Sequence, residues 1–148
     1  MNFLGIDPGA SGGIACVYDG GVPFAEARKM PGTPKDILAF LCNWDLESSV
    51  AMIEKVHAMP KQGVSSTFKF GQNFGQLQMA LAASGVRWEE VTPQKWQKEF
   101  GLILPNLSNT DKKNRHKAAA QQLFPSLKIT HAIADALLIA EYCRRRNA

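Results

Sequence analysis

Three acidic residues lie in or beside apolar stretches of the sequence, where a carboxylate is unexpected. Asp7 follows the apolar run Phe3–Ile6, Glu54 interrupts VAMIEKV, and Asp135 interrupts HAIADALLIA. A carboxylate removed from water is costly unless it is paired or binds a metal ion. Carboxylate oxygens on rigid elements suit Mg²⁺ or Mn²⁺. If the three acids converge, they predict a site for such cations.

His131 precedes Asp135 by four residues, so both side chains would lie on one face of a helix. An imidazole in the ligand set would favour Mn²⁺ slightly. Structural alternatives remain open for both residues. His131 could cap its helix, and Asp135 could complement the positive end of the helix dipole.

Asp7 and Glu54 also have structural alternatives. Asp7 begins the sequence Asp-Pro-Gly, which is typical of a turn into a hairpin. Glu54 could face a sheet edge and pair with Lys55 or Lys61. All three acids being incidental is less plausible than any single alternative.

Short apolar segments separated by turns predict an α/β fold that would position these acids. The expected strands are Asn2–Ile6, Ile14–Tyr18, Pro23–Arg28, Val50–Val56 and Val86–Val91. The expected helices are one capped by Thr33, then Gln72–Ser84, Pro93–Phe100, Asp111–Leu123 and Ile133–Cys143. Lys61–Phe70 resembles a loop or a frayed helix start. The order predicts a five-stranded mixed sheet, an antiparallel meander plus parallel strands, flanked by helices.

The composition predicts one folded domain over residues 1–148, with 45% hydrophobic and 20% charged residues. No apolar run approaches the roughly 20 residues that span a bilayer, and no signal peptide is recognisable, so no membrane partner is expected. Three widely spaced cysteines fit neither a zinc site nor a disulfide framework. They are typical of the reducing cytoplasm.

The formal net charge is +4, and the basic residues gather in the last third of the chain. They are Lys95, Lys98, Lys112, Lys113, Arg115, Lys117, Lys128 and Arg144–Arg146. A basic region on a folded domain favours a polyanionic partner, most simply nucleic acid. For Arg144–Arg146 the alternative is a helix C-terminus, where cations are favourable.

Taken in order, the motifs resemble the RuvC family of Holliday-junction resolvases, in its bacteriophage branch. The similar segments are GIDPG, VAMIEKV, GQNFGQLQMALAASG, VTPQKWQK, KAAAQQLFP and IADALLIAEY, which together cover nearly the whole chain. The resemblance implies an RNase H-like fold and a homodimer. It also implies two divalent cations, Mg²⁺ or Mn²⁺, and paired nicks across a four-way DNA junction in the cytoplasm, that of the host if the protein is phage-encoded.

The resemblance also assigns roles to residues. The implied metal ligands are Asp7, Glu54, His131 and Asp135. The candidates for a cationic catalyst are Lys113 and Lys117, which are four residues apart and so share one helix face. In such sites two cations about 3.5–4 Å apart bracket a phosphodiester, and a lysine can stabilise the charge of the transition state. For the two lysines a solvated basic helix face remains open.

An aromatic segment completes the expected DNA interface. An exposed aromatic side chain can stack on bases where a junction is already open. Phe68 and Phe70 are the candidates for this wedge, whereas Phe74 is expected in the core. The full predicted DNA-binding set is Lys61, Phe68, Lys69, Phe70, Lys95, Lys112, Lys113, Arg115 and Lys117.

Three other functions compete with junction resolution. The acidic strand and glycine turn also resemble the phosphate loop of actin-like kinases, but those need a second such loop and a second domain. A junction-binding protein without catalysis would not need the acid set. A nuclease of broader specificity, which cuts flaps, forks and three-way junctions, fits the sequence equally well.

Overall fold

Strand β1 (Asn2–Asp7) lies at the centre of the fold, in a computed structural model that describes residues 1–20 and 24–148. It pairs antiparallel with β2 (Gly13–Tyr18) and parallel with β4 (Ser49–Glu54). β3 (Ala25–Lys29) pairs antiparallel with β2, and β5 (Arg87–Val91) pairs parallel with β4. The predicted five-stranded mixed sheet is confirmed, with the order β3-β2-β1-β4-β5.

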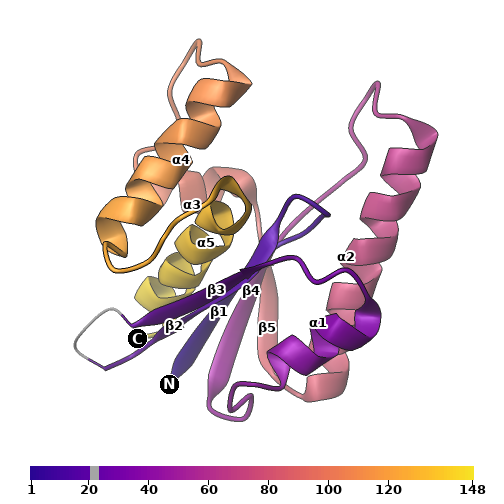
Figure 1. Ribbon diagram of the computed structural model, residues 1–148, viewed down its shortest axis with the longest axis vertical. Helices are drawn as coiled ribbons and strands as arrows, with labels where there is room; N and C mark the ends of the chain where they lie inside the picture. Colours follow the sequence, from indigo (N-terminus) through magenta and orange to yellow (C-terminus); the bar gives the residue numbers. More distant parts are fainter. Residues whose placement is uncertain (21–23) are drawn as a thin grey trace.

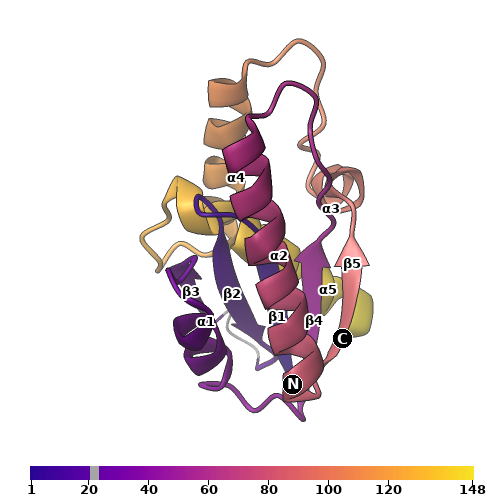
Figure 2. The ribbon, with the colours of Figure 1, turned by 90° about the vertical axis from the view of Figure 1, so that its right-hand side faces the viewer.

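Helices cover both faces of this sheet (Figures 1 and 2). One face carries α1 (Pro34–Leu41) and α2 (Val64–Ser84), and the other carries α3 (Pro93–Glu99), α4 (Asn109–Leu123) and α5 (His131–Asn147). Side chains of β1 alternate between the two layers. Phe3 packs with the α5 side, whereas Leu4 and Ile6 pack with α1 and α2. Burial on both faces explains why the strand is an unbroken apolar run.

Helix α5 crosses directly over β1 at Gly5. A Cβ at Gly5 would overlap backbone atoms of Ala136 and Ala140 in α5. The missing side chain therefore lets the helix backbone lie against the strand, with small residues of α5 in the contact. Because Asp135 immediately precedes Ala136, this crossing holds its side chain near the end of β1.

Some element boundaries differ from the predictions. α2 begins at Val64, so of the two alternatives for Lys61–Phe70 the helix start is observed and the loop is not. Its first two turns are exposed or only partly buried, so no apolar periodicity marked them. β4 ends at Glu54 and α5 begins at His131, whereas Pro23 of the expected third strand lies outside the described residues.

The arginines at the end of α5 have a structural role. Glu141 is buried, and it accepts hydrogen bonds from Arg144 and Arg145 at 2.8–2.9 Å. Burial raises the pKa of Glu141, but these two guanidinium groups outweigh it and hold that pKa below its usual value. Arg145 also bonds Glu99 of α3 at 3.2 Å. The structural alternative for this basic cluster is therefore favoured.

Within the described parts of the chain, no helix is both long and apolar enough to cross a membrane.

Candidate active site

Asp7 and Glu54 lie side by side because each ends a strand of the same parallel pair. Their neighbours Ile6 and Ile53 are register partners in β1 and β4. The α5 crossing at Gly5 brings the third acid, Asp135, to the same edge of the sheet. The three predicted acids thus come together from three separate elements. Their charges interact: Glu54 and Asp135 raise the pKa of Asp7, and Asp135 raises the pKa of Glu54.

The electrostatics of this cluster are those of crowded, partly desolvated carboxylates. Burial raises the pKa of Asp7 well above its usual value, and the charges of Asp135 and Glu54 raise it further. Burial likewise raises the pKa of Glu54 to about 7, against a lowering contribution from a hydrogen bond with Trp96. Holding Asp7 and Glu54 both ionised at neutral pH therefore requires nearby positive charge.

Two residues that the sequence did not single out hold two of these acids in place. The indole Nε1 of Trp96 donates to Oε2 of Glu54 at 2.7 Å. Nδ1 of His116 hydrogen-bonds to Oδ1 of Asp135 at 2.8 Å. The rings of Trp96 and His116 meet edge to face with centroids 5.3 Å apart. Trp96 and His116 thus form a bridge that fixes Glu54 and Asp135 relative to each other.

No feature of the sequence marked His116, because its burial is a property of the folded structure. His116 and Ala120 are the buried residues of the otherwise polar helix α4. A buried histidine needs a polar partner, which Asp135 supplies here. Trp96 was not marked either, because a buried tryptophan in a short helix is commonly part of the core.

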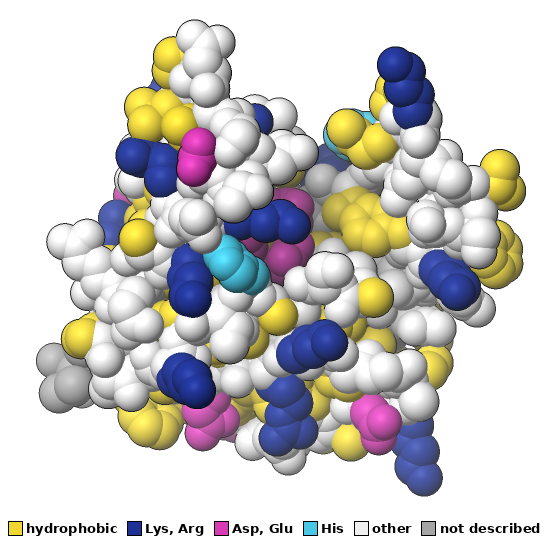
Figure 3. All heavy atoms as spheres, turned by 45° about the horizontal axis from the view of Figure 1, so that its top comes forward, with side chains coloured by type: hydrophobic (Ala, Val, Ile, Leu, Met, Phe, Trp, Pro, Cys, Tyr) yellow, Lys and Arg dark blue, Asp and Glu magenta, His cyan; other side chains and the backbone are white. Residues whose placement is uncertain are grey.

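Two of the three acids, Asp7 and Asp135, line a cleft of about 300 Å³, whereas Glu54 is not part of its lining. Figure 3 shows acidic side chains in the depth of a hollow between two projecting parts of the molecule, with cationic and histidine side chains on one side. The polar side chains that line the cleft are Asp7, Ser11, Lys113, His131 and Asp135. Phe70 of α2 forms part of the opposite wall.

His131 and Lys113 therefore line the same cleft as Asp7 and Asp135. His131 is the exposed first residue of α5, one turn before Asp135. Within residues 1–20 and 24–148, however, no three His, Cys, Asp or Glu side chains are arranged to hold one ion as they stand.

The structural alternatives for Glu54 and Asp135 are not favoured. Glu54 bonds Trp96 and not Lys55 or Lys61. Asp135 is the fifth residue of α5 and lies beyond its first turn, where a dipole effect would be strongest.

The glycine turn after Asp7 is fixed by helix α2. The Gly9 N–H donates to Oδ1 of Asn73 at 2.8 Å. Gly9 has φ +107°, and a Cβ there would lie 2.7 Å from Cε2 of Phe70. The Phe70 ring therefore rests directly on the turn, which gives this wall of the cleft a defined position.

The other predicted DNA-binding residues do not line the acidic cleft. Lys69 lines a neighbouring hollow, and Phe68 is 71% exposed on α2. The remaining members, Lys61, Lys95, Lys112, Arg115 and Lys117, line neither. Phe74 packs against the core, as predicted.

Comparison with solved structures identifies the fold. The chain superposes on Thermus thermophilus RuvC in complex with a Holliday junction substrate with a TM-score of 0.68, at 18% identity, covering 99% of this chain and 97% of that one. A second Thermus thermophilus RuvC structure gives a TM-score of 0.62 at 18% identity, covering 100% and 98%. The fold is that of RuvC, an RNase H-like fold. No family model and no curated protein matches the sequence.

The raised pKa of Glu54 predicts a pH-dependent stability. The carboxyl holds a proton in the folded state up to about pH 7, against an ordinary value of 4.5. Stability from this proton is therefore lost as pH rises from about 4.5 through about 7. We expect Glu54→Gln to flatten that loss, so that without metal the variant exceeds the parent in stability at pH 8.

The measurement is urea unfolding at several pH values with a chelator present. Glu89→Gln, at an exposed acid of β5, is the matched control and should follow the parent curve. A Glu54→Gln curve parallel to the parent would contradict the assigned burial cost.

Proposed function

We propose that this protein is a metal-dependent endonuclease that nicks four-way DNA junctions symmetrically and so resolves them. The observation that carries the proposal is the convergence of Asp7, Glu54 and Asp135 at one edge of a RuvC-like sheet. The neighbour with bound Holliday junction supports branched DNA as the substrate class. Assignment to the bacteriophage branch and to the cytoplasm rests on the sequence motifs and composition.

The donor set fits divalent cations. Asp7, Glu54 and Asp135 supply oxygen ligands, and the charges of Glu54 and Asp135 raise the cost of ionising Asp7. A bound cation would remove that cost, which is the physical reason to expect one here. His131 on the cleft wall would complete the set. Two Mg²⁺ or Mn²⁺ ions would activate a water molecule and stabilise the leaving 3′-oxygen.

Other residues of the chain would position the metal ligands and stabilise the charge on the phosphate. Trp96 and His116 hold Glu54 and Asp135 by hydrogen bonds, as ligating carboxylates commonly require. Lys113 on the cleft wall would meet the charge that develops on the scissile phosphate. Lys117 is absent from that wall, so of the two candidate lysines Lys113 is preferred. The products would carry 5′-phosphate and 3′-hydroxyl ends.

The decisive experiment is cleavage of labelled four-way, three-way, flap and duplex DNA with Mg²⁺ and with Mn²⁺. Paired nicks confined to the four-way junction support resolution. Comparable cutting of flaps and three-way junctions would favour the broad branch nuclease. Binding without cutting in either metal would favour an inactive junction-binding protein.

His131 is expected to tune the metal requirement. His131→Ala should raise the Mg²⁺ concentration for half-maximal nicking several-fold, because one ligand is lost. His131→Asp should be tolerated, because a carboxylate is a harder ligand that suits Mg²⁺. Metal titrations of nicking rate measure both, with His57→Ala, at another exposed histidine, as the control. Identical titrations of parent and His131→Ala would make His131 structural.

Paired nicks need two sites, which we propose a homodimer supplies through α2. Val64, Phe68 and Met79 are exposed by 89%, 71% and 68%. Their spacing places them on one stripe of the helix, with Gly71 and Gly75 between them, opposite the face that buries Leu77 and Leu81. An exposed apolar stripe with small residues allows close approach of a second copy. Phe68 fits this surface better than the wedge role.

We expect the protein to sediment at twice its monomer mass of 16.2 kDa. Phe68→Glu with Met79→Glu should shift it to monomer, because each buries a charge in the contact. Leu38→Glu, at an apolar residue of α1 that is 43% exposed, is the control and should remain dimeric. A monomeric parent, free and on junction DNA, would count against paired cleavage.

A further inference from the structure

Two of the three acids are hydrogen-bonded to buried aromatic side chains. Trp96 is fully buried, and its Nε1–H donates to Oε2 of Glu54 at 2.7 Å. His116 is also buried, and its Nδ1 lies 2.8 Å from Oδ1 of Asp135. An ionised carboxylate only accepts hydrogen bonds, so Nδ1 of His116 is the donor to that form of Asp135. Each acid is therefore anchored through one identified oxygen.

The two donors hold each other in position. Their rings meet edge to face with centroids 5.3 Å apart. Trp96 packs in the core layer that also contains Ala120 of α4 and Leu137 of α5. His116 lies one turn before Ala120 on α4. In a close-packed interior neither ring can turn without displacing its neighbours, so both hydrogen-bond donors stay in place. The planes of the two carboxylates are restrained in consequence.

Restrained carboxylates suit some divalent cations better than others. Mg²⁺ binds oxygen at about 2.0–2.1 Å, requires near-octahedral geometry and keeps several water molecules. Ca²⁺ binds at about 2.3–2.6 Å and takes roughly 6–8 oxygens, which can include both oxygens of one carboxylate. To chelate Ca²⁺ in that way, Glu54 or Asp135 would have to rotate, and rotation would break its anchoring hydrogen bond. The two bonds therefore disfavour Ca²⁺ more than Mg²⁺.

We propose that Trp96 and His116 are positioning residues that set which divalent cation the acids bind. They hold Glu54 and Asp135 in an orientation that suits Mg²⁺ and disfavours Ca²⁺. This role rests on the proposed nuclease function, because the acids must first be metal ligands. Neither aromatic side chain needs to touch a cation, since each acts through the carboxylate that it holds.

The test measures cation binding to the full-length protein without DNA. Free Mn²⁺ gives an electron paramagnetic resonance signal that is largely lost on binding, so the signal reports the bound fraction. Mg²⁺ and Ca²⁺ are each titrated against bound Mn²⁺, and the ratio of their displacing concentrations measures discrimination. Because both titrations use the same sample, this ratio does not depend on the fraction of the protein that is folded.

Trp96→Phe keeps an aromatic ring and removes the N–H. The affinity for Mg²⁺ should fall by about 10–100-fold, as for other groups that orient a metal ligand. The affinity for Ca²⁺ should fall less, because the released carboxylate can turn both oxygens to the larger ion. The ratio should therefore shift several-fold toward Ca²⁺. His116→Leu should shift it in the same direction, and His116→Asn, whose amide N–H can replace the Nδ1–H, should restore the parent ratio.

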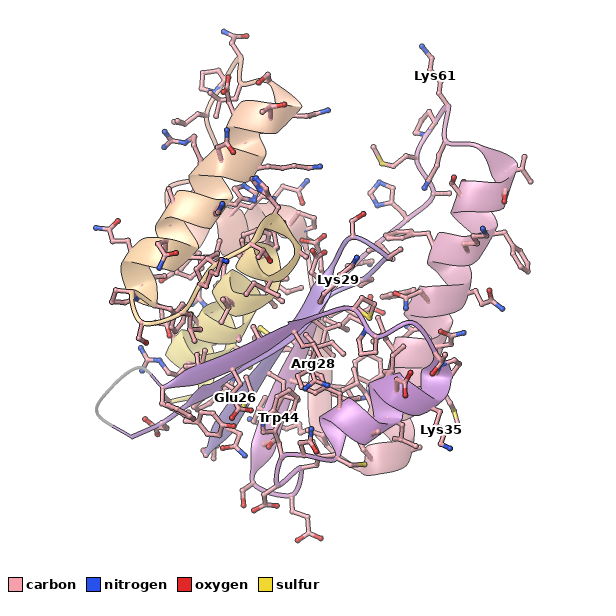
Figure 4. All side chains as sticks on the ribbon, in the orientation of Figure 1. Glu26, Arg28, Lys29, Lys35, Trp44 and Lys61 are labelled. Carbon is pink, nitrogen blue, oxygen red and sulfur yellow. The ribbon has the colours of Figure 1, made fainter. Side chains whose placement is uncertain are left out.

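Trp44→Phe is the matched control. Trp44 is another buried tryptophan, and its Nε1–H also donates to a glutamate, Oε2 of Glu26, at 3.4 Å. Figure 4 shows Trp44 and Glu26 beside each other on the side of the sheet that α1 covers, whereas Trp96 packs in the opposite layer. The control loses the same ring and the same kind of bond away from the acids, so its ratio should equal that of the parent.

Four results would overturn the inference. These are a parent that binds Ca²⁺ as tightly as Mg²⁺, a ratio unchanged in Trp96→Phe or His116→Leu, no restoration by His116→Asn, and an equal shift in Trp44→Phe. If the parent binds Mn²⁺ and nicks four-way junctions, only the discrimination by these two residues fails. If the parent binds no Mn²⁺ and nicks no branched DNA, the proposed function fails as well.

Discussion

Asp7→Asn is expected to abolish nicking of four-way junctions while leaving junction binding intact. The change removes one carboxylate charge from the cluster and keeps the size and hydrogen-bonding capacity of the side chain. Loss of a partner that only orients a metal ligand costs about 10–100-fold, so loss of a direct ligand should exceed about 100-fold. Binding should persist because phosphate contacts come from lysines and not from the acids.

Stability measurements separate this loss from unfolding. Burial and the charges of Asp135 and Glu54 raise the pKa of Asp7, so its ionisation destabilises the fold as pH rises through that pKa. Without metal at pH 8, Asp7→Asn should therefore be at least as stable as the parent. Asp19→Asn, at an exposed acid, is the matched control for both assays. Undiminished nicking by Asp7→Asn would remove the basis of the metal-site assignment.

Gly5→Ala should have the largest effect on stability, although it adds only one methyl group. That methyl would meet backbone atoms of Ala136 and Ala140, which cannot move aside as a side-chain end can. Overpacking commonly costs about 1–3 kcal/mol, and we expect about 3 kcal/mol or more here. In a domain of this size this corresponds to a lowering of Tm by roughly 6–12 °C.

Gly32→Ala is the control, because a Cβ at Gly32 would meet nothing within 4 Å. It should be neutral within about 0.5 kcal/mol. Displacement of α5 by Gly5→Ala should also move Asp135 away from Asp7, so residual folded protein should nick poorly. A Gly5→Ala protein with the parent Tm would show that α5 does not lie against β1 as described.

The central strand of the sheet and the start of α1 follow from local sequence alone. The Phe3–Ile6 run is apolar at every position except Gly5, and this pattern is typical of a central strand covered on both faces. Thr33 and Pro34 mark the start of α1, where Thr33 Oγ1 accepts the Asp36 N–H at 3.1 Å. Such signals are readable because they depend on residues only a few positions apart.

For the start of α2, local sequence allowed both a loop and a frayed helix start and could not decide between them. Its first turns bury too little to create an apolar period, so the helix there continues from the packed part around Leu77 and Leu81. Which of the two candidate lysines lies on the cleft also depends on the tertiary structure. Lys113 and Lys117 are equivalent by helical spacing, and only the packing of α4 against α5 places Lys113 on the cleft.

For the candidate site, the sequence by itself determined that Asp7, Glu54 and Asp135 each lie in or beside an apolar stretch of the chain. The tertiary structure decided what surrounds them. Trp96 is 42 residues from Glu54, and His116 is 19 residues from Asp135. No local pattern links residues so far apart. These pairs form because α3 and α4 pack on the face of the sheet that α5 covers. The hollow that Lys69 and Phe70 line forms because α2 packs on the other face.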